Sequence, residues 1–266
     1  MITGYADEKR KIAAQFSRAA KEYDSVASFQ REVADYLLNA RVTPAQRANE
    51  VWLDLGVGTG YALPSLRQLN PKGALIALDI AEGMLVHASE TCDRLAVSRV
   101  CGDAEHLPLG SETVHRVFSS LAVQWCFDPT QLYRELHRVL KVGGRATLAT
   151  LTESSLCELK QAWRVIDNDV HVNHFLSHGD ILKHAQPYFS VNSEEKTYHL
   201  NYPDVIGLMR DLKKIGANHV IGKASSGLSK RNYLRQLMKA YEPFSEDQGV
   251  RATYEVCFLD LVKVSE

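Results

Sequence analysis

Val51-Trp-Leu-Asp-Leu-Gly-Val-Gly-Thr-Gly60 is the stretch that decides the fold, because it combines a short apolar strand with three alternate glycines. Glycine has no Cβ, so it lets the backbone turn sharply and approach a ligand closely. The next apolar run, Ala74 to Asp79, ends on a carboxylate. An acid at the end of the second strand of an α/β sheet can accept the hydroxyl protons of a ribose. The two features together predict a site for an adenosine-bearing cofactor.

The residue after the third glycine distinguishes two kinds of adenosine cofactor. A dinucleotide fingerprint, Gly-x-Gly-x-x-Gly, needs a glycine or alanine at its sixth position for close packing of helix on strand. This chain has Tyr61 there, which disfavours a nicotinamide oxidoreductase. The pattern Asp-x-Gly-x-Gly-x-Gly instead resembles motif I of the class I methyltransferases, which bind S-adenosylmethionine. We therefore predict that cofactor, with a ligand-free glycine turn as the structural alternative.

Composition limits the size and class of the protein. The 266 residues are 45% hydrophobic, which is enough for one substantial core. The formal net charge is -1, so overall charge indicates neither a nucleic acid nor an anionic membrane as partner. The chain shows no signal core and no span of membrane length, which predicts a cytoplasmic protein. Five scattered cysteines without Cys-x-x-Cys spacing argue against a disulfide framework and against a metal site.

Strands and helices alternate along the first part of the chain. Residues 7–41 have helical spacing of apolar side chains and predict two amphipathic helices. Strands are then predicted at 51–55, 74–79, 97–101, 116–119 and 145–151, with helices between most of them and a Gly143-Gly144 break before the last. Five strands alternating with helices predict a mostly parallel sheet with right-handed crossovers.

Residues beyond 152 break this alternation, with predicted helices at 154–167, 179–186, 203–216 and 229–241 and strands at 194–200 and 253–264. We expect an α/β, Rossmann-like class I methyltransferase fold with a mostly parallel seven-stranded sheet. One folded unit would then contain three segments. These are an N-terminal helical cover (1–45), the cofactor-binding core (46–152), and helical lid insertions with the last strands (153–266).

The predicted cofactor residues lie at strand ends, because ligands of open α/β sheets bind beyond the carboxyl ends of the strands. Asp79 would bind the ribose, and Asp54 would orient the glycine turn. Asp103 follows the third strand and matches the acid that bonds the adenine amino group in class I methyltransferases. The full predicted set is Asp54, Gly56, Gly58, Gly60, Asp79, Ile80, Met84, Asp103, Ala104, Ser119 and Leu121.

Motifs outside the glycine turn resemble the malonyl-[acyl-carrier protein] O-methyltransferases of biotin synthesis, and the resemblance covers most of the chain. They are Phe16-Ser-Arg-Ala-Ala-Lys-Glu-Tyr23, Leu121-Ala-Val-Gln-Trp-Cys126, Leu159-Lys-Gln-Ala-Trp-Arg-Val-Ile-Asp167, Asn173-His-Phe-Leu176 and Leu212-Lys-Lys-Ile-Gly-Ala-Asn-His219. The family often has Arg in place of His174 and Asn in place of Ser120. The resemblance implies methyl esterification of the free malonyl carboxylate, carried by acyl-carrier protein or by coenzyme A.

This reaction needs a binding site more than a base. A carboxylic acid with a pKa of about 4 is already ionised at pH 7, so it needs positioning rather than deprotonation. Burying it is costly unless a cation or a hydrogen-bond donor receives it. The candidates are Tyr23 and Arg18, Gln124 and Trp125, and Arg210, Lys213 and His219. Core aromatics and a solvated basic helix face are the alternative interpretation of these residues.

Residues 208–240 carry eight basic side chains against Asp211 alone, eight minus one giving +7. We expect this basic segment to dock an acidic acyl-carrier protein, with an ordinary solvated surface as the alternative. Two other functions share the cofactor motifs: methylation of another small acid or of a quinone precursor, and a cofactor-binding subunit without turnover.

Overall fold

The computed structural model describes residues 2–167, 169–217, 230–246 and 249–265, and it contains the predicted, mostly parallel sheet. Five strands are parallel: β1 (Val51–Leu55), β2 (Ala74–Asp79), β3 (Ser98–Cys101), β4 (Val114–Ser120) and β5 (Leu140–Leu151). β8 (Gly249–Val262) runs antiparallel between β5 and β6 (Ser190–Tyr202). The order β3-β2-β1-β4-β5-β8-β6 confirms the predicted seven-stranded sheet, to which the two-residue β7 (Ser245–Glu246) adds a pairing with β8.

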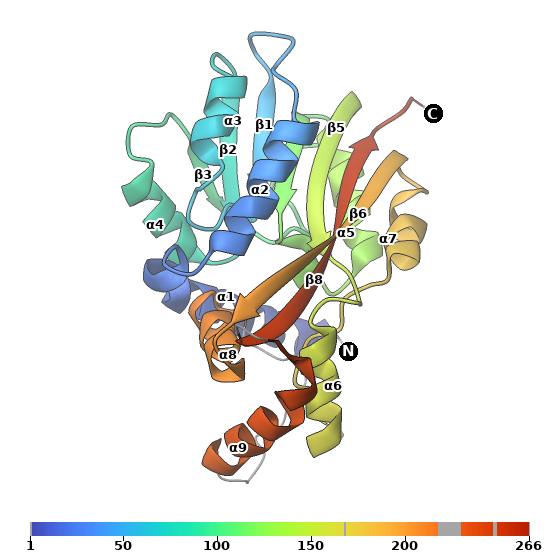
Figure 1. The fold of residues 1–266 in the computed structure, drawn as a ribbon. Helices are drawn as coiled ribbons and strands as arrows, with labels where there is room; N and C mark the ends of the chain where they lie inside the picture. Colours follow the sequence, from blue (N-terminus) through green and yellow to red (C-terminus); the bar gives the residue numbers. More distant parts are fainter. Residues whose placement is uncertain (1, 168, 218–229, 247–248, 266) are drawn as a thin grey trace.

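Helices cover both faces of this sheet (Figure 1). One core lies between the sheet and α2 (Ser28–Arg41) and α3 (Leu63–Leu69), and includes Trp52 of β1. A second core lies under α5 (Pro129–Val139) and α7 (His178–Ala185), and includes Leu53 and Leu55. Successive side chains of β1 therefore enter different cores, as expected of a strand buried on both faces.

The remaining helices lie beside the sheet or beyond the ends of its parallel strands. They are α1 (Ile2–Tyr23), α4 (Glu82–Thr91), α6 (Cys157–Ile166), α8 (Val205–Lys214) and α9 (Lys230–Tyr241), with the short 3-10 helices η1 (Val123–Trp125) and η2 (Glu242–Phe244). α1 packs on α4 and α8, and α6 packs on α9. Figure 1 shows α1, α6, α8 and α9 at the lower end of the molecule, whereas α4 lies at the left beside β3. None of the described helices is long and apolar enough to cross a membrane.

A break at Gly143-Gly144 was predicted before a strand at 145–151, but β5 continues through this glycine pair. Gly143 has a φ of +76°, but its N–H donates to Lys263 O at 2.8 Å, and Lys263 N–H donates to Gly144 O at 3.0 Å. These bonds extend β5 to residues 140–151, with an irregular register against β4 between Val114 and Arg116. The sequence signal for a turn was correct at Gly143, but pairing with the C-terminal segment keeps the chain in the sheet.

Candidate functional site

The glycine turn after β1 forms one wall of a cavity at the carboxyl ends of the strands. Gly56 and Gly58 have backbone φ angles of +73° and +54°, which residues other than glycine rarely adopt. A Cβ on Gly56 would overlap the Cβ of Ala122, so this position is closed by packing. A Cβ on Gly58 would meet no atom within 4 Å. Gly58 therefore presents bare backbone to the open cavity.

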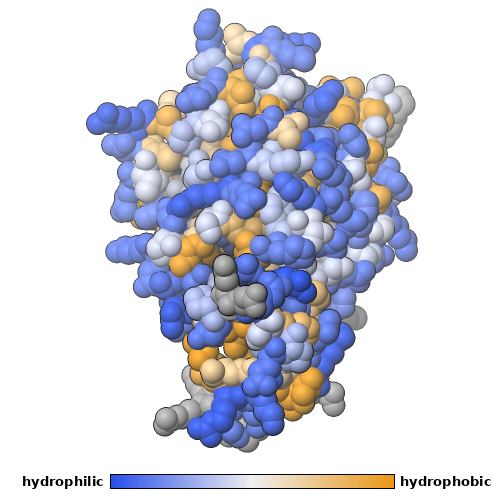
Figure 2. Space-filling view, in the orientation of Figure 1, coloured by the Kyte–Doolittle hydropathy of each residue, from blue (hydrophilic) through white to orange (hydrophobic). Residues whose placement is uncertain are grey.

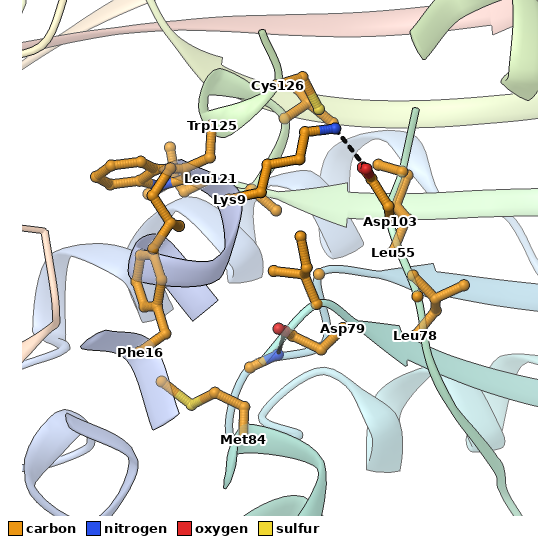
Figure 3. A pocket seen from close by; sticks show the side chains of 18 of the residues that line it. Lys9, Phe16, Leu55, Leu78, Asp79, Met84, Asp103, Leu121, Trp125 and Cys126 are labelled. Carbon is orange, nitrogen blue, oxygen red and sulfur yellow. Dashed lines mark hydrogen bonds and ion pairs between the residues drawn. The ribbon is translucent and has the colours of Figure 1, made fainter. Parts of the chain in front are cut away.

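Asp79 ties this turn to the end of β2. Its buried carboxylate accepts the Gly58 N–H at 2.9 Å through Oδ2 and the Ala81 N–H at 2.8 Å through Oδ1. Burial raises the pKa of Asp79, although these backbone hydrogen bonds oppose the shift. Each oxygen has a further lone pair, so the carboxylate can hold the turn and still accept two ribose hydroxyls. Figure 3 shows Asp79 in the wall of the cavity.

Eight of the eleven predicted cofactor residues line this first cavity: Gly56, Gly58, Asp79, Ile80, Met84, Asp103, Ala104 and Leu121. The other three have different positions. Gly60 packs beside α4, where a Cβ would meet Ala88 at 3.2 Å. Ser119 is fully buried and donates its Oγ hydrogen to Leu55 O at 2.7 Å. Asp54 lines a smaller neighbouring cavity that shares Gly56 and Gly58 with the first.

Asp54 provides a test of whether S-adenosylmethionine fits here. Its Oδ2 is buried and has no hydrogen-bond partner among the described residues. Burial, with a smaller contribution from Asp79, raises the pKa of Asp54 to about 8. An unpartnered acidic oxygen beside the open glycine turn suits a positively charged group on the ligand. The ammonium of the methionine part of S-adenosylmethionine is such a group, so these residues fit the predicted cofactor.

Side chains of α1 close the first cavity. Of these side chains, only Tyr23 was predicted to belong to a site. Lys9, Ile12, Phe16 and Tyr23 all line it, and their spacing places them on one face of the helix. Lys9 Nζ pairs with both Asp103 and Glu105, and Figure 3 shows its contact with Asp103. Burial alone would lower the pKa of Lys9, but these two acids outweigh it and raise the pKa.

A second cavity adjoins the first and shares Phe16, Tyr23, Leu121 and Trp125 with it. Phe16 and Trp125 meet edge to face, with ring centroids 5.2 Å apart. Burial raises the pKa of Tyr23 well above its usual range, so its phenol stays protonated and can donate a hydrogen bond. The shared wall is therefore aromatic, with one hydroxyl group.

Side chains from several distant segments complete the second cavity. Its further walls include Gln30 of α2, Gln124 of η1, His171 and Asn173 after α6, and Met209 and Leu212 of α8. Of the predicted acceptor residues, Tyr23, Gln124 and Trp125 line it. Arg18, Arg210 and Lys213 are exposed and line neither cavity. His219 lies outside the described residues.

Two wall residues, His171 and Asn173, were not predicted from the sequence, although Asn173 opens one of the quoted motifs. They follow a polar stretch, Asp167-Asn-Asp, that resembles a surface loop, so no periodicity indicated that the next residues are buried. A polar loop beside a quoted motif was the only available signal.

The fold and the glycine-turn cavity define a class I methyltransferase. A methyltransferase-domain family model matches residues 53–148. The structure is similar to a putative methyltransferase from Bacillus halodurans, with a TM-score of 0.61, 18% identity, and coverage of 87% of this chain and 99% of that one.

Relatives in sequence identify the family. The malonyl-[acyl-carrier protein] O-methyltransferase of Yersinia pestis is 41% identical over 237 residues, covering 88% of this chain and 85% of the relative. The biotin biosynthesis bifunctional protein BioHC of Cellvibrio japonicus is 41% identical over 97% of this chain, which spans about half (51%) of that protein's length. The chain belongs to the malonyl-[acyl-carrier protein] O-methyltransferase family. The predicted family, fold class and S-adenosylmethionine cofactor are thereby confirmed.

Proposed function

We propose that this chain transfers a methyl group from S-adenosylmethionine to the free carboxylate of malonyl-acyl-carrier protein, in the cytoplasm and as an early step of biotin synthesis. The observation that carries the proposal is the pair of cavities joined at Phe16, Tyr23, Leu121 and Trp125. In this proposal the first cavity holds the adenosine-bearing methyl donor and the second holds the acyl group. The names of the relatives supply the acceptor.

The residues at the shared wall would position the acceptor rather than activate it. When bound, S-adenosylmethionine supplies an electrophilic methyl group on a sulfonium. Phe16, Leu121 and Trp125 exclude water from the junction, which strengthens the interactions that orient the carboxylate. The Tyr23 hydroxyl can donate a hydrogen bond to a carboxylate oxygen and keep its own proton, because burial raises its pKa. The nucleophile arrives already ionised, so the geometry needs no general base.

A mass-resolved transfer assay tests the proposed reaction. The protein is incubated with isotope-labelled S-adenosylmethionine and, separately, malonyl-, acetyl- and succinyl-carrier protein. We expect one labelled methyl on the malonyl group and none on acetyl-carrier, because the acetyl group has no free carboxylate. Transfer to acetyl-carrier, or none to malonyl-carrier, would falsify the assignment. Efficient transfer to a quinone precursor or another small acid would favour the alternative functions.

We further propose that α8 and α9 dock the carrier. Among the described side chains, Arg210 and Lys213 of α8 and Arg235 and Lys239 of α9 are exposed. Leu234 and Met238 of α9 are 39% and 46% exposed beside the last two. Figure 2 shows apolar and hydrophilic side chains close together at this lower end of the molecule. A mixed basic and apolar surface suits an acidic carrier, because charge steers the encounter and apolar contacts retain it.

Charge reversal separates docking from catalysis. We expect the pair Arg235→Glu and Lys239→Glu to raise the KM for malonyl-carrier at least about tenfold and to leave the KM for a small malonyl thioester unchanged. Lys72→Glu, at an exposed position before β2, is the matched control. Equal effects on both substrates would refute the docking surface and leave the methyl transfer intact.

A further inference from the structure

The second cavity needs a group that can receive a carboxylate, and most of its walls cannot. Its lining is largely aliphatic and aromatic, and the polar exceptions are few. Gln124 donates its amide N–H to Leu121 O at 2.7 Å and accepts a hydrogen bond from Thr150 Oγ1 at 3.5 Å. Its amide oxygen and one of its two amide hydrogens are therefore engaged, and the group carries no charge. Within the described lining, His171 is the only side chain that can carry a positive charge.

His171 is held firmly in this wall. Its side chain is 5% exposed, and its Nε2 lies 2.7 Å from Asp167 Oδ1. Its ring stacks on Trp163 of α6 with centroids 3.8 Å apart and an interplanar angle of 5°. Such a ring loses little conformational freedom when it binds a ligand, because its orientation is already fixed.

Asp167 gives the His171 ring a negatively charged hydrogen-bond partner. Burial alone would raise the pKa of Asp167, but hydrogen bonds from His171, from the Asp169 N–H and from Tyr233 lower it. An ionised Asp167 can only accept at this contact, so His171 donates its Nε2–H to Asp167 and the ring orientation is fixed.

We propose that His171 receives the carboxylate of the acyl substrate, with Asp167 and Trp163 as positioning residues. This inference rests on the proposed function and assigns its acceptor-binding group. Two of the basic side chains predicted from the sequence, Arg210 and Lys213, lie on α8. The side chain inferred here lies in the segment after α6. α8 contributes Met209 and Leu212 to the cavity, while its Arg210 and Lys213 are exposed.

The test compares substrates with and without a carboxylate. The full chain and His171→Gln are assayed with a small malonyl thioester as substrate and an acetyl thioester as competitor. We expect the KM for the malonyl thioester to rise about 30-fold or more, with a smaller loss in kcat. The inhibition constant of the acetyl thioester should change less than about twofold, because it has no carboxylate to lose. Asp167→Asn should raise the same KM by a smaller factor, about five- to tenfold.

Controls separate this role from a structural one. His178→Gln removes a different histidine that pairs with a carboxylate, Glu195 at 3.1 Å, outside both cavities, and should leave the KM unchanged. Binding of S-adenosylhomocysteine, measured by calorimetry, verifies that each variant is folded, and His171→Asn is a second variant if His171→Gln fails that check. An unchanged malonyl KM in a folded variant, or equal weakening of both thioesters, would overturn the inference. A wild-type protein that methylates no malonyl thioester would overturn the proposed function itself.

Discussion

The two cavities of this protein are built in different ways. The first is formed largely by strand ends: the turn after β1, the acid that ends β2, and the residues after β3 and β4. The second is formed largely by side chains of α1, α2, α8 and the segment after α6, which the sheet does not hold in register. Hydrogen-bonded neighbours fix the positions of strand ends relative to one another, whereas helices find theirs by packing. We call the first cavity the proposed donor site and the second the proposed acceptor site. Substitutions in the donor site should therefore be tolerated less well than substitutions in the acceptor site.

The strongest test of this contrast is Gly58→Ala. The new methyl group would meet no protein atom, so it would occupy space that the cofactor needs. We expect the affinity for S-adenosylhomocysteine to fall at least about 100-fold, which corresponds to about 3 kcal/mol. The cost to folding should be only about 1 kcal/mol, because alanine at this φ is strained but not crowded.

Gly143→Ala is the control for that substitution. Gly143 has a φ of +76° and equally open surroundings, but it lies at the start of β5, away from both cavities. It should lose similar stability and no affinity, as measured by chemical denaturation and calorimetry. Equal loss of affinity in both variants would mean that backbone strain, rather than the bare surface of Gly58, explains the effect.

The sequence predicted most of the residues that line the first cavity at strand ends, because the signals for them are local. The apolar run 51–55 and the glycines after it define a strand and a turn, and β1 and β2 have the predicted bounds. Once two parallel strands are known, the end of each lies at the same edge of the sheet, so Asp79 and Asp103 could be assigned from the order of the strands along the chain. Ser119 failed as a lining residue because alternation along β4 points it into the protein, and the register of a short strand was not known to one residue.

A second test measures how the burial of Asp54 affects the free energy of unfolding. An unfolded aspartate has a pKa of about 3.9, whereas folding raises the pKa of Asp54 to about 8. Between these values the folded state holds a proton that the unfolded state has lost. The free energy of unfolding should therefore fall as pH rises through this window, by up to about 1.4 kcal/mol per pH unit from this group.

Asp54→Asn removes that proton linkage. The variant should gain stability relative to wild type as pH rises, by about 2 kcal/mol between pH 5 and pH 6.5. Urea denaturation at several pH values measures the difference. Parallel stability curves for the two proteins would contradict the raised pKa of Asp54 and remove the argument that an unpartnered acid awaits a cationic ligand group.

The acceptor site could be predicted only in part, and the reason is the distance between its parts. Tyr23, Gln124 and Trp125 come from motifs that also mark strand ends or amphipathic helices, so pattern and resemblance found them. The basic residues of α8 predicted the wrong inward face for this helix. Met209 and Leu212 line the cavity, whereas Arg210 and Lys213 do not. His171 could not be found, because its burial depends on stacking against Trp163 of α6.

Lys9 offers the finest test, because it lies where a helix meets a strand end. Glu105 is almost fully buried and keeps the Asp128 N–H at 2.7 Å and the Phe127 N–H as partners when the lysine is removed. We therefore expect Lys9→Met to cost only about 1–2 kcal/mol of stability, below the usual cost of an unpaired buried charge. Amide hydrogen exchange in the first half of α1 should become faster. Lys11→Met removes an exposed pair with Glu8 and should cost less than about 0.5 kcal/mol.

The effect of Lys9→Met on cofactor affinity decides whether α1 belongs to the donor site or only covers it. Removing Lys9 weakens the closure of α1 but also frees Asp103 to accept from an adenine amino group. These two effects oppose each other, so affinity for S-adenosylhomocysteine should change less than about fivefold. A loss as large as that of Gly58→Ala would show instead that a helix can define the donor site as strictly as the strand ends do, and the contrast between the two cavities would then fail.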